Sequence, residues 1–89
     1  MKRIQRKRSK GWRMPKNTVY VGRPTKWGNM YKVGRDGTAQ ECVDKYEWCL
    51  NFTGRIYEVA ELKGKNLACF CPLDQPCHAD VLLRLAAQA

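Results

Sequence analysis

Apolar residues recur along this chain in two patterns, one typical of strands and one typical of helices. Thr18–Gly22 combines β-branched and aromatic residues, which favours a strand, and we expect it to be the central one. Asn66–Cys71 follows a turn at Gly64 and has the composition of a short buried strand. Tyr31–Val33 is a candidate for a short edge strand.

Helical spacing is present in three further segments. Thr38 and Glu41 have the spacing of a capping box, so a helix should begin there. Its predicted buried stripe is Cys42, Val43, Tyr46, Cys49 and Leu50. A second, shorter helix is indicated by Ile56, Val59, Ala60 and Leu62. A third should start at Cys77 and bury Val81, Leu82, Leu85 and Ala86.

The order strand, helix, helix, strand, helix implies a crossover connection between the two main strands. Such a crossover would make these strands parallel and adjacent. The sequence therefore predicts a single small α/β domain with a short, mostly parallel sheet packed by about three helices. We assign residues 18–89 to the compact domain and residues 1–17 to a basic N-terminal arm and connection that is a candidate for an additional strand.

Charge is distributed unevenly along the chain. Residues 1–35 contain twelve Lys or Arg and no acidic residue, whereas residues 36–89 contain five basic and eight acidic residues, so the two parts carry +12 and −3. This asymmetry favours a polyanionic partner, nucleic acid before membrane, because no amphipathic face and no apolar run of ~20 residues accompanies it. The arm residues expected to contact phosphates are Lys2, Arg3, Arg6, Lys7, Arg8, Lys10 and Arg13. The alternative is a solvated tail that contacts nothing.

The chain has five cysteines, an odd number. No apolar segment follows the basic N-terminal residues, so a secretory signal is not expected. Reduced thiols in a cytoplasmic protein are therefore the simplest interpretation, and disulfides are the minor alternative.

Candidate chemistry is concentrated in the segment from Cys69 to Asp80. Three of the five cysteines and the single histidine fall within ten consecutive positions. Side chains alternate along a strand, so Cys69 and Cys71 should share a face, while Cys77 and His78 should lie at the start of the last helix. Cys69, Cys71, Cys77 and His78 are therefore predicted ligands of a zinc ion.

This ligand spacing is not one of the usual zinc-finger patterns. The alternative is that the strand cysteines are buried in the core and His78 is a surface residue of the helix start. Cys42 and Cys49 are expected to be core residues of their helix rather than ligands.

The loop after the first strand carries several potential ligand contacts. Arg23 could make a bidentate contact to phosphate, and Lys26 could neutralise a second anionic oxygen. Trp27 offers a stacking face, and Asn29 could recognise an amide or a base edge. The alternative for Trp27 is that it packs in the core. Because this loop and the loop before Cys77 leave the carboxyl ends of parallel strands, we expect a joint site.

Two motifs give the chain a resemblance to a known family. Residues 19–29 (Val-Tyr-Val-Gly-Arg-Pro-Thr-Lys-Trp-Gly-Asn) are followed by residues 62–73 and 77–82, which include Ala-Cys-Phe-Cys-Pro-Leu and Cys-His-Ala-Asp-Val-Leu. Together they resemble the domain-of-unknown-function family 4326, small proteins of bacteria and phages. The resemblance covers nearly the whole chain and implies a compact α/β fold, but no agreed activity. Members usually continue Gly-Asn-Pro-Phe, where this chain has Met30 and Tyr31.

Three classes of function stay open. The first, which we favour, is a small basic protein that binds nucleic acid or a nucleotide and is stabilised by the zinc site. The second is an enzyme or sensor for a nucleotide-like phosphorylated ligand, with Cys77, His78 and Asp80 as candidate catalytic residues and a homodimer able to complete the pocket. The third is a phage effector that binds a host protein through its basic face. No motif fixes a reaction type.

Overall fold

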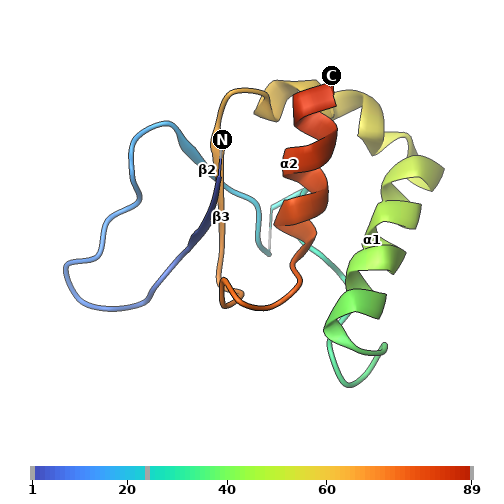
Figure 1. Cartoon of the computed structure of the whole chain (residues 1–89), viewed down its shortest axis with the longest axis horizontal. Helices are drawn as coiled ribbons and strands as arrows, with labels where there is room; N and C mark the ends of the chain where they lie inside the picture. Colours follow the sequence, from blue (N-terminus) through green and yellow to red (C-terminus); the bar gives the residue numbers. More distant parts are fainter. Residues whose placement is uncertain (1, 24, 89) are drawn as a thin grey trace.

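The computed structural model describes residues 2–23 and 25–88 of the chain. Its elements are β1 (Arg3–Gln5), β2 (Thr18–Tyr20), α1 (Ala39–Thr53), the 3₁₀ helix η1 (Arg55–Leu62), β3 (Asn66–Cys69) and α2 (His78–Gln88). The predicted α/β class, parallel sheet and three helical segments are confirmed (Figure 1). None of the described helices is long and apolar enough to span a lipid bilayer.

The sheet has the strand order β1-β3-β2, and both neighbours of β3 run parallel to it. Ile4 and Val19 flank the central strand at Ala68 and Leu67, respectively. The predicted parallel pairing of the two main strands is confirmed. The expectation that the Thr18–Gly22 strand is central is wrong, because β1 of the arm pairs with the other side of β3 and leaves β2 at an edge.

No strand forms at the candidate segment 31–33 among the described residues. The backbone amide of Tyr31 donates to the Asn29 side chain at 2.9 Å, and that of Lys32 donates to the Asp36 carboxylate at 2.8 Å. Local side-chain acceptors thus occupy donors that a strand would present to its neighbour.

Helix α1 begins and ends where its local sequence requires. The Thr38 hydroxyl accepts from the Glu41 amide at 3.2 Å, and the Glu41 carboxylate accepts from the Thr38 amide at 2.9 Å, which completes the predicted capping box. Gly54 ends the helix with φ of 79°, a left-handed conformation that costs glycine little. Four residues of the expected stripe are buried and Cys49 is half-buried.

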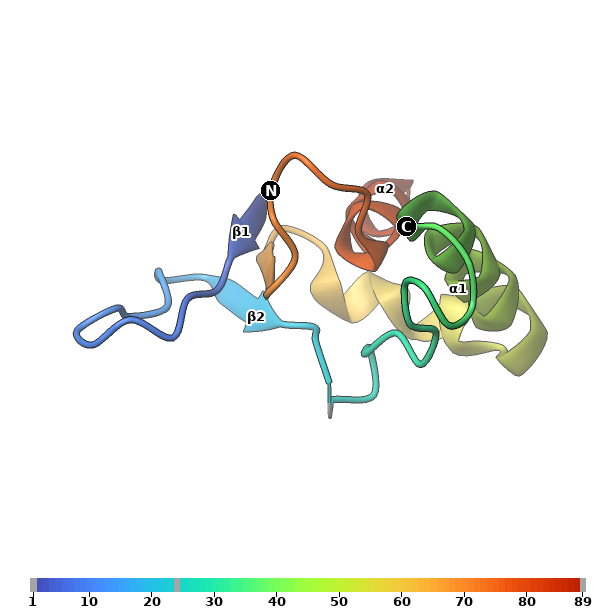
Figure 2. The ribbon, with the colours of Figure 1, turned by 90° about the horizontal axis from the view of Figure 1, so that it is seen from below.

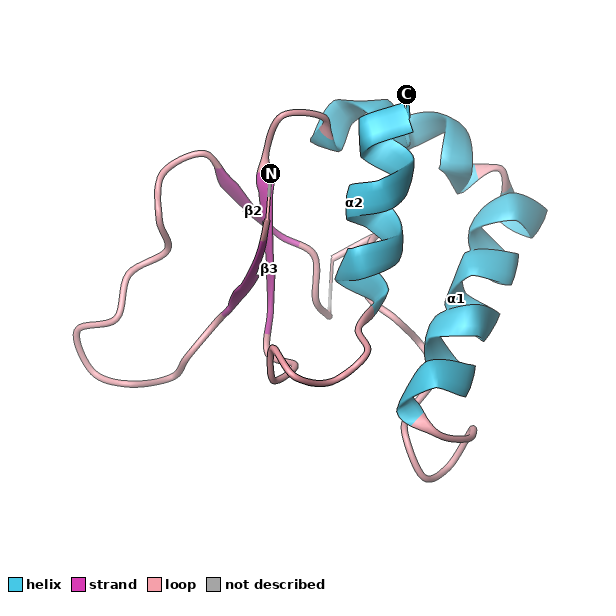
Figure 3. Ribbon diagram, viewed as in Figure 1, coloured by secondary structure: helices cyan, strands magenta, loops and turns pink. Residues whose placement is uncertain are grey.

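The three helices lie on one side of the sheet, and α2 lies between the sheet and α1 (Figure 3). Leu67 of β3 and Leu82 of α2 are both completely buried where these layers meet, and Val21 after β2 joins them. The long loop of residues 6–17, between β1 and β2, projects from the opposite side of the sheet, away from the helices (Figure 2). Basic residues are therefore presented on a loop anchored at both ends by strands.

Candidate functional site

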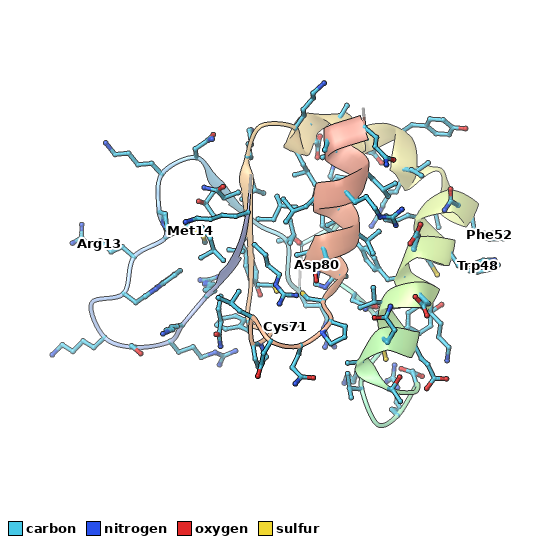
Figure 4. The ribbon with its side chains drawn as sticks, in the orientation of Figure 1. Arg13, Met14, Trp48, Phe52, Cys71 and Asp80 are labelled. Carbon is cyan, nitrogen blue, oxygen red and sulfur yellow. The ribbon has the colours of Figure 1, made fainter. Side chains whose placement is uncertain are left out.

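Three cysteines converge where β3 ends and α2 begins. Cys69 is the last residue of β3, Cys71 follows two positions later, and Cys77 directly precedes α2. Their sulfur atoms all lie within 4.8 Å of one another, and the sulfurs of Cys69 and Cys77 are 2.9 Å apart. Figure 4 shows Cys71 in the loop that joins β3 to α2. This group of sulfurs, which we call the thiol cluster, is the only potential metal site of three or more such side chains within the described residues.

His78 lies beside the thiol cluster with its ring orientation fixed. Its Nε2 is 2.8 Å from the backbone oxygen of Val21, and its ring packs edge-on against Tyr46 at 4.9 Å between centroids. A carbonyl oxygen only accepts, so Nε2 carries the proton, and the unprotonated Nδ1 of the neutral ring can accept from the Cys77 thiol, 3.7 Å away. Burial lowers the pKa of His78, which favours that neutral form.

Of the four predicted zinc ligands, the fold brings the three cysteine sulfurs close together but not the histidine. Nδ1 of His78 is 3.7 Å from the Cys77 sulfur, but the histidine is outside the group of mutually close sulfurs. The alternative interpretation of His78 as a surface residue is wrong, because the residue is 6 % exposed and anchored to Val21.

Contacts within the cluster shift the pKa values of the three thiols in opposite directions. Hydrogen bonds from Cys69 and then from Cys77 lower the pKa of Cys71, so its thiolate is the favoured anion of the cluster. The same contacts raise the pKa of Cys69, chiefly through Cys71, and that of Cys77, chiefly through Cys69.

The cluster could hold a metal ion. A tetrahedral zinc ion with Zn–S bonds of 2.3 Å would separate its sulfur ligands by ~3.8 Å. The Cys69 and Cys77 sulfurs are 2.9 Å apart, so they would have to move apart by about 0.9 Å to reach that geometry. Thiolate donors are soft, so this set suits zinc better than magnesium or calcium.

A pocket of about 970 Å³ opens next to the thiol cluster, and we call it the basic pocket. Its basic lining residues are Arg6, Lys7, Arg8, Arg23 and Lys32, and no acidic residue is among the lining residues. Aromatic rings are supplied by Tyr20, Tyr31 and Phe70, and one wall is formed by Cys69, Cys71, Cys77 and His78. The two loops that leave the carboxyl ends of β2 and β3 thus border one pocket, as their parallel order requires.

Cation–π contacts hold two of these guanidinium groups against aromatic rings. Arg6 lies 4.4 Å from the centroid of the Tyr20 ring, and Arg8 lies 4.7 Å from that of Phe70. Arg6 also approaches Phe70 at 5.3 Å. The guanidinium groups of Arg6 and Arg8, stacked on these rings, therefore form a flat and positively charged side of the pocket.

The predicted ligand loop divides between the basic pocket and the core. Arg23 and Asn29 line the pocket. The stacking face expected of Trp27 is not available, because the residue is 3 % exposed, packs in the core, and accepts a 2.6 Å hydrogen bond from Tyr46 on its backbone oxygen. Lys26 is not among the pocket residues and forms ion pairs with Glu58 and Glu61 at 3.2 and 2.8 Å.

The predicted arm residues also have different environments. The Arg3 side chain is 8 % exposed, pairs with Asp80 at 2.8 Å, and donates to the backbone oxygens of Pro72 and Leu73. It is thus committed to internal contacts, and Asp80, a candidate catalytic residue, is not among those lining the basic pocket. Lys2 donates its backbone amide to Asn66, while Lys10 and Arg13 are exposed within the 6–17 loop. Figure 4 shows Arg13 on this projecting loop.

Comparison with known proteins places this arrangement in a family. The family model described as a domain of unknown function, DUF4326, matches residues 4–88, from β1 to the end of α2. The chain belongs to the DUF4326 family. It is also 26 % identical over 99 residues to an uncharacterised protein of Acanthamoeba polyphaga mimivirus, covering 92 % of this chain and 76 % of the viral one. No solved structure matches the chain.

Some pocket residues of this DUF4326 member were not predicted from the sequence. Lys32 and Phe70 line the basic pocket, although neither was singled out. Phe70 lies between two cysteines that share a strand face, so alternation places its ring on the opposite face, toward Tyr20, with 5.9 Å between centroids. The alternation of side chains along the strand could therefore have identified Phe70 as a pocket residue. No local sequence pattern identifies Lys32 as one.

Proposed function

We propose that this chain binds single-stranded nucleic acid, with one nucleotide unit in the basic pocket and neighbouring phosphates along the 6–17 loop. The observation that carries the proposal is the lining of the pocket, in which five basic side chains and three aromatic rings surround about 970 Å³ with no carboxylate among the lining residues. The basic side chains can bind the phosphate groups of a nucleic acid, and the aromatic rings can stack against a base.

A single strand of nucleic acid fits this surface better than a free nucleotide does. The basic surface continues from the pocket onto the projecting loop, where Lys10, Arg13 and Lys16 are exposed and make no ion pair among the described residues. It therefore extends beyond a single nucleotide unit. An unpaired strand is required because a base can enter a pocket beside aromatic rings only when it has left its stack.

Arg23 is the side chain best placed to recognise a phosphate. It is exposed, lines the basic pocket and has no ion-pair partner among residues 2–23 and 25–88. Its guanidinium group can bind two phosphate oxygens at once without removing an existing protein contact. Its loss should weaken binding without opening a cavity in the core.

Fluorescence anisotropy with a labelled oligothymidylate tests the proposal. We expect Arg23→Ala to weaken binding by about tenfold or more, since a hydrogen bond to a charged group contributes ~1.5–3 kcal/mol. Lys65→Ala is the matched control, because it removes one exposed charge at the turn before β3, outside the pocket lining. The salt slope should fall by ~0.7 for each lost phosphate contact.

Two comparisons separate the proposal from its alternatives. A duplex of the same length should bind more weakly than the single strand, and nucleoside triphosphates should compete only at much higher concentration. Equal effects of the Arg23 and Lys65 substitutions would contradict the role of the pocket. Tight binding of a free nucleotide without binding of the oligonucleotide would show that the pocket serves a small ligand instead.

We also propose that the thiol cluster binds one zinc ion through Cys69, Cys71 and Cys77. The observation that favours it is the convergence of three sulfurs within 4.8 Å. A further candidate ligand is Nδ1 of His78, which the Val21 contact leaves unprotonated and which lies 3.7 Å from the Cys77 sulfur. Three thiolates and one zinc ion carry a net charge of −1, which the basic side chains around the pocket would offset.

Metal analysis of protein purified without chelator tests the zinc proposal. We expect about one zinc ion per chain, lost together with stability in Cys69→Ser. Cys49→Ser is the control, because Cys49 lies on α1 and is not part of the thiol cluster. A metal-free wild type that is as stable as the zinc-supplemented protein would remove this proposal and leave nucleic-acid binding untouched.

A further inference from the structure

We propose that the thiol cluster is an oxidation site at which peroxide reacts first with Cys71 and the final product is a disulfide between Cys69 and Cys77. This inference rests on the geometry of the cluster and not on the proposed binding of nucleic acid. It assigns a different role to each of the three thiols.

The first observation is the separation of the two buried sulfurs. Cys69 and Cys77 are each 2 % exposed, and their sulfurs are 2.9 Å apart. A disulfide bond is ~2.05 Å long, so closing it needs a shift of less than ~1 Å. The two residues lie at the end of β3 and just before α2, so the bond would close only the short loop between those elements.

The second observation is the difference in exposure within the cluster. All three cluster cysteines line the basic pocket, but only Cys71 is half-buried rather than buried, so it is the most exposed residue of the cluster. The two other cluster cysteines are almost completely covered. A small oxidant would therefore meet Cys71 first, and the resolving thiol is already beside it because all three sulfurs lie within 4.8 Å.

The remaining cysteines lack this arrangement. Cys49 has its sulfur 3.0 Å from the Tyr31 hydroxyl, and Cys42 is buried near the backbone oxygen of Gly37. Neither belongs to a group of three close ligands in the part of the chain that the structure describes. They provide an internal comparison for reactivity in the same molecule.

The chemistry balances in three steps. The Cys71 sulfur attacks a peroxide oxygen, the O–O bond breaks, and the products are a Cys71 sulfenic acid and water. The Cys77 sulfur then attacks the Cys71 sulfur, the S–O bond breaks, and a second water leaves as a Cys71–Cys77 disulfide forms. Finally the Cys69 sulfur attacks that of Cys77 and releases Cys71 as a thiol. Overall, two thiols are oxidised and one peroxide molecule is reduced to two waters.

The product has a structural consequence for the basic pocket. A Cys69–Cys77 bond would tie the end of the central strand to the start of α2 and fix the pocket wall that both residues line. It would also remove two of the three sulfurs available to a metal ion. Oxidation and metal binding therefore exclude each other at this cluster.

Peptide mapping of the full-length, metal-stripped and reduced protein tests the inference. The protein is treated with one equivalent of hydrogen peroxide, remaining thiols are alkylated, and chymotrypsin is applied. Cleavage after Phe70 and Leu73 separates Cys69, Cys71 and Cys77 into three peptides. We expect the peptides of Cys69 and Cys77 to be linked, with Cys71, Cys42 and Cys49 alkylated.

Two measurements test the order of events. Dimedone present during oxidation should label Cys71 in the wild type, which needs no variant. Cys71→Ser should form the same disulfide at least about tenfold more slowly, while Cys49→Ser should keep the wild-type rate. Circular dichroism of the reduced variants checks that both are folded.

The opposite results are equally clear. Linkage through Cys42 or Cys49, or linkage mainly between chains, would overturn the assigned disulfide. Dimedone on Cys69 or Cys77 but not on Cys71 would overturn the assigned point of attack. Neither result depends on oligonucleotide binding, so the inference and the proposed function fail separately.

Discussion

Replacing Arg3 by alanine should affect stability far more than binding, although Arg3 belongs to the basic arm. Its guanidinium group connects β1 to the loop before α2 through Asp80 and the backbone oxygens of Pro72 and Leu73. The side chain is only 8 % exposed, so these contacts are shielded from water. Arg3 therefore helps to hold the segment that carries Cys71 and Cys77.

The expected loss is about 3 kcal/mol in the free energy of unfolding. Two hydrogen bonds from a charged donor to carbonyl oxygens contribute ~1.5–3 kcal/mol each in favourable cases, and their effects do not add fully. The pair with Asp80 adds at most about 1 kcal/mol, because the Asp80 side chain is 55 % exposed. For a domain of this size the loss corresponds to a melting temperature lower by ~12–24 °C.

Urea unfolding followed by circular dichroism measures this loss. Asp80→Asn should cost less than about 1 kcal/mol, because it removes only the exposed partner. Lys7→Ala is the control from the same arm, and it should change stability by less than ~0.5 kcal/mol because Lys7 is exposed. If Arg3→Ala unfolds at the wild-type urea concentration but binds oligonucleotide poorly, the internal role of Arg3 is refuted.

Other predictions concern the core and the start of α1. Trp27→Ala should destabilise the protein by about 3–5 kcal/mol in urea unfolding, and a folded variant with a selective loss of binding would instead support a stacking role. Thr38→Ala should cost about 0.5–2 kcal/mol by the same measurement, and an unchanged midpoint would contradict the cap. Hydrogen bonds from the Thr38 amide and hydroxyl lower the pKa of Glu41 in the folded protein. The stabilisation that Glu41 gives to the folded state is therefore complete above its unfolded-state pKa and is lost as pH falls through its folded-state pKa. When the free energy of unfolding is measured at decreasing pH, Glu41→Gln should weaken its dependence on pH. An unchanged dependence would contradict the role of Glu41 in the capping box.

The elements that could be predicted from the sequence are those specified by neighbouring residues. The capping box of Thr38 and Glu41 is a local signal, and the structure forms both of its hydrogen bonds. The parallel pairing of β2 with β3 followed from their order in the chain, because a crossover between adjacent strands leaves them parallel. The convergence of Cys69, Cys71 and Cys77 followed from strand alternation and the short loop before α2.

Features set by distant partners could not be predicted. β1 has one apolar residue, Ile4, so its pattern did not reveal that it would displace β2 from the centre of the sheet. The sequence left open whether Trp27 stacks on a ligand or packs in the core, because its burial depends on how its loop packs against α1, where Tyr46 bonds to its backbone. The role of Arg3 depends on Asp80, which is 77 positions away.

The position of β1 also constrains the order in which the chain can fold. Lys2 bonds to Asn66, 64 positions later, and among residues 2–23 and 25–88 β3 is the only strand that pairs with β1. During synthesis β1 therefore leaves the ribosome before β3 and cannot pair with it until β3 has emerged, and such long-range closure slows folding. Residues 1–35 carry twelve basic and no acidic side chains, so like-charge repulsion opposes self-association of this segment during that interval. Assembly of the sheet is thus a late event, completed only when the same segment that carries Cys69 becomes available.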